Sequence, residues 1–349
     1  MEQTPNVKAS LEQQTEAARS AERRTFLVRA AAALVGLVAL VVVVDVLTHG
    51  NFLTAGNLTN VLRQITYNAI LAVGQTFVII TAGIDLSVGS LIELTGVVMA
   101  TFANAMPFGG FGLIVATLCV GLAVGCGAGF VNAVPVVRLN LPPFITTLAM
   151  MLMARGLAFK LAHGQPVPVR SDAFESIGTG YVLSGLMAPL HLPGIPIAVL
   201  WMAAIFIVFG VLLARTRFGR YVYAIGGNEE AARLAGINVA AVKTAVYMIS
   251  GGCAAVSGLL LMSRFSSGSP QTGIGTELQS IAAVVVGGTS LMGGRGAIVG
   301  TFLGALLIGV LNNVMNLIGI ESYTQDIVLG VVILLAVVLD ELRKRYLAR

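Results

Sequence analysis

The polar run at residues 215–243, RTRFGRYVYAIGGNEEAARLAGINVAAVK, determines how the rest of the chain must be arranged. Strongly apolar sequence flanks this charge-bearing run on both sides, so the run must lie in water. Asn228 is a good N-cap, and Glu229 and Glu230 follow in the first turn, where negative charge suits the helix dipole. Gly236 stands where a left-handed C′ residue belongs. The pattern predicts a short helix between Asn228 and Gly236.

A helix of about two turns is marginal in water by itself, so this one must rest against something. Its outward side chains, Glu229, Glu230 and Arg233, are polar. Two interpretations follow. The helix is either a docking element for another protein or an ordinary loop helix packed on its own chain, and the residues alone leave both open.

The composition defines the class of protein. Of the 349 residues, 56% are hydrophobic and only 11% are charged, and the mean hydropathy is +0.90. Soluble domains carry about 25% charged residues, and apolar runs of about 18 or more residues mark membrane spans. The chain has room for about ten spans and for no separate soluble domain. We therefore expect an all-α integral membrane protein, a polytopic bundle of about ten transmembrane helices, with no nucleic-acid partner.

Clusters of basic residues set the expected topology, because they remain on the cytoplasmic side. The first cluster precedes or begins the apolar run Phe26–Leu47, the second flanks the 215–243 stretch, and the third closes the chain. Both termini are thus predicted to be cytoplasmic. The predicted domains are a polar cytosolic tail at 1–25, a membrane domain at 26–343 with a cytosolic loop at 215–243, and a basic cytosolic C-terminus at 344–349.

Two spans are interrupted by glycine-rich segments, GIDLSVG at 83–89 and GGTSLMGGRG at 287–296. Broken backbone at membrane depth is tolerated only where protein or a water-filled path satisfies its polar groups. Asp85 is therefore a candidate path residue. The simpler alternative is a capping carboxylate at the cytosolic end of a hairpin. The residues between 264 and 279, rich in Gly and Ser, are expected to form an outer loop.

Other polar residues lie within the predicted spans. Asn68, Gln75 and Asn312 either line a polar passage or tie helices together by hydrogen bonds. With Asp85, these three are the candidate translocation-path residues. Arg155 and Lys160, in the span that ends near Ala162, are expected to extend towards an interface.

Small residues four apart, Gly121, Gly125 and Gly129, give one predicted span a smooth face. Such a face lets a neighbouring helix approach closely. We therefore interpret it as a packing surface and not as a chemical site.

The sequence contains no pattern typical of catalysis. The nearest approach to a Walker A motif, residues 288–295, lacks the Gly-Lys-Ser/Thr end that holds phosphate. No His, Cys or Asp spacing suggests a metal site, and no Ser/His/Asp set is apparent. Intramembrane acids are few, which weakens the case for an ion-coupled transporter. We predict a conduit driven from outside the chain, with no catalytic residue, no metal and no cofactor of its own.

Four long stretches point to a family. They are GQTFVIITAGIDLSVGSLIELTG at 74–96, GRYVYAIGGNEEAARLAGINV at 219–239, IAAVVVGGTSLMGGRGAIVGTFLGALLIGVLNN at 281–313 and LLAVVLDELRKR at 334–345. With these stretches in the family's order, the chain after about residue 25 resembles the permease subunit of bacterial ABC importers for simple sugars, closest to the ribose type. The N-terminal tail is longer and more charged than the family leads us to expect, and we assign it no role.

The resemblance implies a homodimer in the bacterial inner membrane that moves a monosaccharide from periplasm to cytoplasm. It also implies a cytosolic ATPase subunit, which binds the ATP, and a periplasmic sugar-binding protein. The predicted short helix becomes the coupling helix, with the residues Asn228, Glu229, Glu230, Arg233, Leu234 and Gly236. The alternatives are a branched-chain amino-acid permease, an ion-coupled secondary sugar transporter and a membrane-embedded transferase.

Overall fold

The computed structural model describes residues 38–39, 41–46, 48–187 and 194–347, and no side chains at 339–341 or 343–347. The predicted tail at 1–25, most of the predicted span Phe26–Leu47, and residues 348–349 lie outside this part. The chain divides into two units, residues 1–50 and 51–349. In the first unit, residues 41–46 are helical, and the Thr48 hydroxyl donates to the Val44 carbonyl at 2.9 Å.

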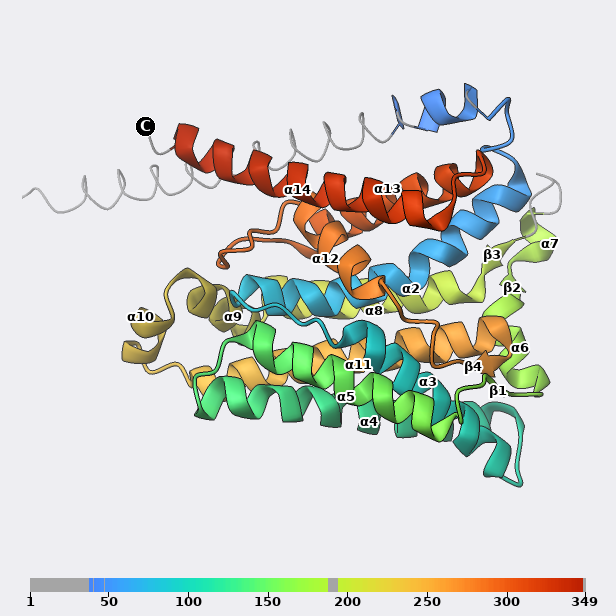
Figure 1. The fold of residues 1–349 in the computed structure, drawn as a ribbon, viewed down its shortest axis with the longest axis horizontal. Coiled ribbons are helices and arrows are strands. Elements are labelled where there is room, and N and C mark those ends of the chain that lie inside the picture. The colour runs from blue at the N-terminus through green and yellow to red at the C-terminus, as the bar shows by residue number, and fades with distance from the viewer. Residues whose placement is uncertain (1–37, 40, 47, 188–193, 348–349) are drawn as a thin grey trace, which may run out of the picture. The chain divides into compact units, whose positions relative to one another are not determined.

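Helices form nearly all of the second unit (Figure 1). They are α2 (Ala55–Ile80), α3 (Val88–Ala105), α4 (Gly110–Arg138), α5 (Pro143–Leu161), α6 (Asp172–Thr179), α7 (Ser184–Met187), α8 (Ile197–Arg215), α9 (Arg217–Gly227), α10 (Glu229–Leu234), α11 (Val239–Phe265), α12 (Thr276–Val286), α13 (Ile298–Leu317) and α14 (Ser322–Leu347). The strands are β1 (Val167–Pro168), β2 (Tyr181–Val182), β3 (Ile195–Pro196) and β4 (Ser267–Gly268), and they pair antiparallel as β1 with β4 and β2 with β3.

Within the described residues, six helices are long and apolar enough to cross a membrane: α3, α4, α5, α8, α11 and α13. The apolar helix α12 and the apolar part of α14, Ser322–Val338, are shorter. The predicted helical membrane architecture is confirmed. The predicted total of about ten spans and the cytoplasmic placement of both termini stay predictions.

Helix α11 is the centre of the second unit and packs against α2, α3 and α4. The glycine face predicted on α4 lies in this contact. A Cβ added at Gly125 would overlap the Gly251 carbonyl, and one at Gly129 would overlap the Tyr247 carbonyl. The prediction that these glycines allow close helix approach is therefore confirmed.

Two helices begin inside the protein. After α2 ends, the chain runs back among the helices before α3 starts (Figure 1), and Asp85 there bonds Ser250 near the middle of α11. The segment that leads into α12 meets the start of α3. A Cβ added at Gly273, three residues before α12, would overlap the Gly89 carbonyl of α3. The first predicted break is thus a buried one. The predicted outer loop at 264–279 is wrong at its end, since Thr276 and Glu277 are buried in the first turn of α12.

Candidate coupling surface and translocation path

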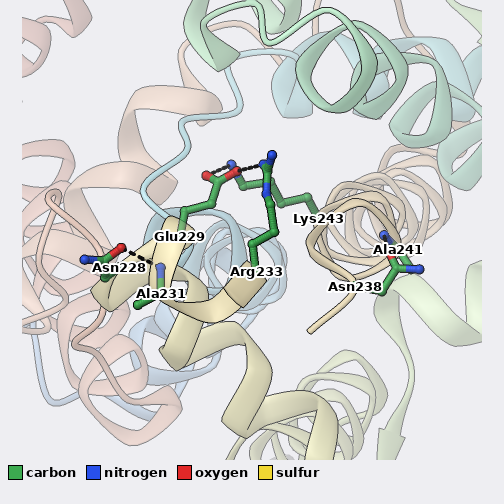
Figure 2. Close-up of polar contacts among 7 residues, drawn as sticks. All are labelled: Asn228, Glu229, Ala231, Arg233, Asn238, Ala241 and Lys243. Atoms are coloured by element: carbon green, nitrogen blue, oxygen red, sulfur yellow. Dashed lines mark hydrogen bonds and ion pairs between the residues drawn. The ribbon is translucent and has the colours of Figure 1, made fainter. Parts of the chain in front are cut away.

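Helix α10 has the N-cap that the sequence predicts. Asn228 has an extended backbone, with φ −161° and ψ 106°, and its side-chain Oδ1 accepts the Ala231 N–H at 2.9 Å (Figure 2). This bond satisfies one of the free N–H groups at the helix start. Asn228 also closes the helix before it, because its N–H donates to the Ala224 carbonyl at 3.1 Å. One residue therefore fixes the angle between α9 and α10.

The C-terminus of α10 also agrees with the sequence prediction. Gly236 has φ +82°, a region that favours glycine. Its N–H donates to Arg233 O at 3.0 Å, and the N–H of Ile237 donates to Ala232 O at 3.1 Å. These two bonds form a Schellman motif, which stops the helix after six residues.

Ion pairs hold α10 against α11. Glu229 accepts from Arg233 at 3.4 Å and from Lys243 of α11 at 2.5 Å (Figure 2). Glu229 is thus used within the chain. Glu230 is exposed, and Leu234 has 81% of its surface exposed. Of the six predicted coupling residues, these two are the ones that the fold leaves most available to another protein.

A pocket of about 280 Å³ with a mixed polar and apolar lining lies beside α10. Its wall combines residues from the end of α4, from α10 and from the start of α11: Val136, Val137, Asn140, Glu229, Arg233, Ile237, Asn238, Val239, Ala240 and Lys243. The α10 surface therefore has both a projecting side chain, Leu234, and a hollow next to it.

The predicted path residues Gln75 and Asp85 lie together. The Gln75 Nε2 donates to the Asp85 backbone carbonyl. The Asp85 carboxylate accepts from the Ser87 N–H at 2.9 Å, from the Ser87 hydroxyl at 2.6 Å and from the Ser250 hydroxyl at 2.7 Å. This carboxylate is fully buried, and whether it caps the cytosolic end of a hairpin or lines the path stays a prediction. It ties the entry of α3 to α11.

The other two predicted path residues do not join this network. The Asn68 amide donates to Gln279 of α12 at 2.6 Å, and Asn312 lies buried in α13. The hydrogen bonds that the structure gives to Asn68, Gln75 and Asp85 link helices. Whether the same groups line the path stays a prediction.

The sequence prediction missed a buried charge cluster. Arg155 of α5 pairs with Glu93 of α3 at 3.1 Å, and Glu93 is fully buried. The positive charge of Arg155 also acts on Glu277 of α12. Among the described residues, Glu93 Oε1, Glu277 Oε2 and Arg155 Nη2 have no hydrogen-bond partner. The expected extension of Arg155 towards an interface is therefore wrong. The signal was the presence of two acids and one base in spans that contain few charges.

No group of three or more His, Cys, Asp or Glu side chains in the described part of the chain is arranged to hold a metal ion.

The helices of the second unit define a multi-pass membrane protein, and comparison with known proteins identifies its kind. Residues 57–337 match the family described as "Branched-chain amino acid transport system / permease component". The chain belongs to this family of transport permeases, whose members are transporter components and not enzymes. It is a multi-pass protein of the bacterial inner membrane.

The similar proteins are import permeases. The ribose import permease protein of Escherichia coli is 45% identical over 311 residues, covering 88% of this chain and 92% of its own. The ribose import permease protein of Haemophilus influenzae is 43% identical over 324 residues, covering 91% and 93%. The xylose transport system permease protein of Escherichia coli is 38% identical, covering 85% and 88%. No solved structure matches the chain.

Proposed function

We propose that this chain is the membrane permease of an ABC importer that moves a monosaccharide, ribose or a related sugar, from periplasm to cytoplasm. The driving subunit is a separate cytosolic ATPase, which binds the ATP. A periplasmic binding protein delivers the sugar, and two copies of the permease form the conduit. In this proposal each copy has about ten spans, with both termini in the cytoplasm.

The sugar substrate is supported by the names of the similar proteins. Relatives named for ribose and for xylose are 38–45% identical over most of the chain. The family description names branched-chain amino acids, but it covers the broader group. A pentose or similar monosaccharide is therefore the substrate we favour over an amino acid.

The observation that carries the proposal is the form of α10. This short helix is capped at both ends, held to α11 through Glu229, and presents Leu234 with 81% of its surface exposed. An exposed leucine at the end of a short polar helix can act as an apolar anchor in a partner's groove. We therefore assign α10 as the coupling helix that the ATPase contacts.

The transport cycle follows from this assignment. ATP brings the two ATPase subunits together, and their motion displaces α10 in each permease. The helices rearrange, the path opens outward and receives sugar from the binding protein, and hydrolysis resets the conduit. The path residues Asn68, Gln75, Asp85 and Asn312 need not hold sugar tightly, because the binding protein supplies selectivity.

The first experiment tests the docking surface. We expect Leu234→Glu and Glu230→Lys to weaken co-purification of the ATPase and to reduce uptake of ribose or xylose by about tenfold, which corresponds to about 1.4 kcal/mol. Leu234→Met keeps an apolar side chain and is the matched control. Normal uptake by the Leu234→Glu, Glu230→Lys double variant would show that α10 is not the docking helix.

The second experiment tests the class of transporter. The purified chain in liposomes should accumulate no sugar under a proton or sodium gradient. Once the ATPase, the binding protein and ATP are added, it should accumulate sugar. Uphill uptake by the chain alone would establish the secondary-transporter alternative. ATP-driven uptake of leucine but not of ribose or xylose would establish the amino-acid alternative.

A further inference from the structure

Helix α9 stands directly behind α10 and packs backbone to backbone on the rest of the protein. At its start, a Cβ added at Gly219 would overlap the Leu213 carbonyl. At its end, a Cβ added at Gly226 would overlap the Ile80 carbonyl, the last carbonyl of α2. Phe218 of α9 also stacks on Phe77 of α2, with ring centroids 6.2 Å apart. The end of α9 therefore bears directly on the end of α2.

The loop between α12 and α13 meets α9 at the same point. The Gly294 N–H donates to the Ile80 carbonyl at 2.9 Å, and a Cβ on Gly226 would also come within 2.5 Å of that Gly294 nitrogen. The Tyr223 hydroxyl of α9 donates to the Gly296 carbonyl at 2.7 Å. Burial raises the pKa of Tyr223 above its usual range, so this hydroxyl keeps its proton and remains a donor. One carbonyl, that of Ile80, thus joins three segments of the chain.

This loop is closed on itself. The Ser290 N–H donates to the Arg295 carbonyl at 2.9 Å, and the Gly293 N–H donates to the Ser290 carbonyl at 3.0 Å. Gly293 and Gly294 have φ of +83° and +71°, which favours glycine at both positions. A loop that is bonded internally moves as a unit and transmits a displacement rather than absorbing it.

The three segments lead to different parts of the membrane domain. Ile80 ends α2, and the next residues enter the buried break that holds Asp85 and starts α3. The loop connects α12, which also begins in the interior, to α13. On the other side, Asn228 lies two residues after Gly226 and is the shared cap at the junction of α9 and α10. Gly226 therefore connects the segment next to α10 with the end of α2 and with the loop that follows α12.

We propose that Gly226 and Gly294 at the Ile80 carbonyl, together with Tyr223 at the Gly296 carbonyl, form a mechanical joint through which movement of α10 is passed to α2–α3 and to α12–α13. These are positioning residues for transport and do not contact the sugar. The inference rests on the proposed function, because it requires that α10 receive the movement of an ATPase. It goes beyond that function by assigning the route that the movement follows.

Two adjacent glycines provide a matched test. An added Cβ at Gly226 meets the backbone of Ile80 and Gly294, whereas one at Gly227 meets nothing within 4 Å. Gly226→Ala should keep the ATPase bound and hydrolysing but lower sugar transported per ATP by about tenfold, within the usual range of coupling between sites. Gly227→Ala should resemble the unmodified protein in both measurements. Both are made in the complete importer in liposomes.

Tyr223→Phe is a second variant that tests the same joint if Gly226→Ala does not fold. It removes only the hydroxyl that bonds Gly296, and we expect a loss of about threefold in sugar moved per ATP, with unchanged ATPase binding. Normal transport per ATP in the folded variants would overturn the joint. Loss of ATPase binding by Tyr223→Phe would overturn it too, because the residue would then act in docking. The unmodified importer separates these results from failure of the proposed function: if it needs no ATPase, the function itself is wrong.

Discussion

The ion pairs of α10 and the ion pair between α3 and α5 use the same side-chain chemistry in opposite surroundings. Glu229 is 39% exposed, and its partner Arg233 is 57% exposed. Glu93 is fully buried, and its partner Arg155 is only 25% exposed. Exposed pairs contribute about 0–1 kcal/mol, whereas removing one partner of a buried pair costs about 3–5 kcal/mol. The first region can be altered at little cost, and the second cannot.

The comparison explains how stability and movement are divided in this protein. The interior cluster links α3, α5 and α12, so it fixes the helices that begin inside the protein. Helix α10 is defined mainly by its caps, which are local, and the exposed ion pair between Glu229 and Arg233 adds little. Because its caps lie within its own sequence, α10 can keep its helical form when it is displaced.

Breaking the interior pair should have the largest effect. Arg155→Met leaves the Glu93 carboxylate buried without its partner. We expect a loss of roughly 3 kcal/mol in the free energy of unfolding, at the low end of the range for buried pairs because Arg155 is partly exposed. Thermal unfolding in detergent measures it. The double variant Glu93→Gln, Arg155→Met should recover most of the loss, and no recovery would mean that Arg155 acts through packing and not through charge.

The Asp85 network should come next. Asp85→Ala leaves the Ser87 N–H and the Ser250 hydroxyl without their buried acceptor, at an expected cost of about 2 kcal/mol, as for hydrogen bonds to a charged group. Asp85→Asn keeps one oxygen acceptor and should lose less. The same unfolding measurement, together with uptake by the folded fraction, checks it. If Asp85→Ala keeps its stability and loses uptake, Asp85 serves the path and not the fold.

Removing the N-cap of α10 should have a smaller and local effect. Asn228→Ala is expected to cost about 1 kcal/mol of helix stability, while Asn228→Asp keeps the cap. Global unfolding should hardly change, but affinity for the ATPase should fall by about fivefold. A titration of the ATPase onto the permease in detergent measures this change. Equal affinities for the two variants would contradict a role for the cap.

The exposed ion pairs should matter least. Glu229→Gln removes the charge that attracts Arg233 and Lys243 but keeps one oxygen acceptor, and we expect a change of about 0.5 kcal/mol or less in stability. Raising the salt concentration should reduce even this difference, since salt screens exposed charges. Unfolding at low and high salt checks it. A loss comparable to that of Arg155→Met would remove the contrast between the two regions.

The caps of α10 were predictable because they depend on residues within ten positions of each other. Asn228 and Gly236 act on the backbone of their own helix, and the structure has both in their predicted roles. The sequence predicted that some helix would approach α4 closely, because glycines four residues apart, such as Gly125 and Gly129, give a span a smooth face. The sequence did not indicate which helix would meet them.

The interior start of α12 could not be read from the sequence. The stretch that ends at Gln279 is rich in Gly and Ser, as outer loops are, and its polar residues Glu277 and Gln279 favour water. The structure instead buries Glu277 in the first turn of α12 and bonds Gln279 to Asn68 of α2. Periodicity and composition contain no information about contacts between residues so far apart in the chain.

The sequence by itself determined the membrane class of this protein, the short helix Glu229–Leu234 with its caps, and the permease family that its long motifs indicate. These follow from hydrophobicity and from hydrogen bonds between near neighbours, which each stretch carries locally. Only the tertiary structure decided that Arg155 pairs with Glu93, that Asp85 bonds α11, and that Gly226 rests on the end of α2. Each of these contacts joins two segments that are far apart in the chain. The distance between such segments is set by the packing of the whole bundle.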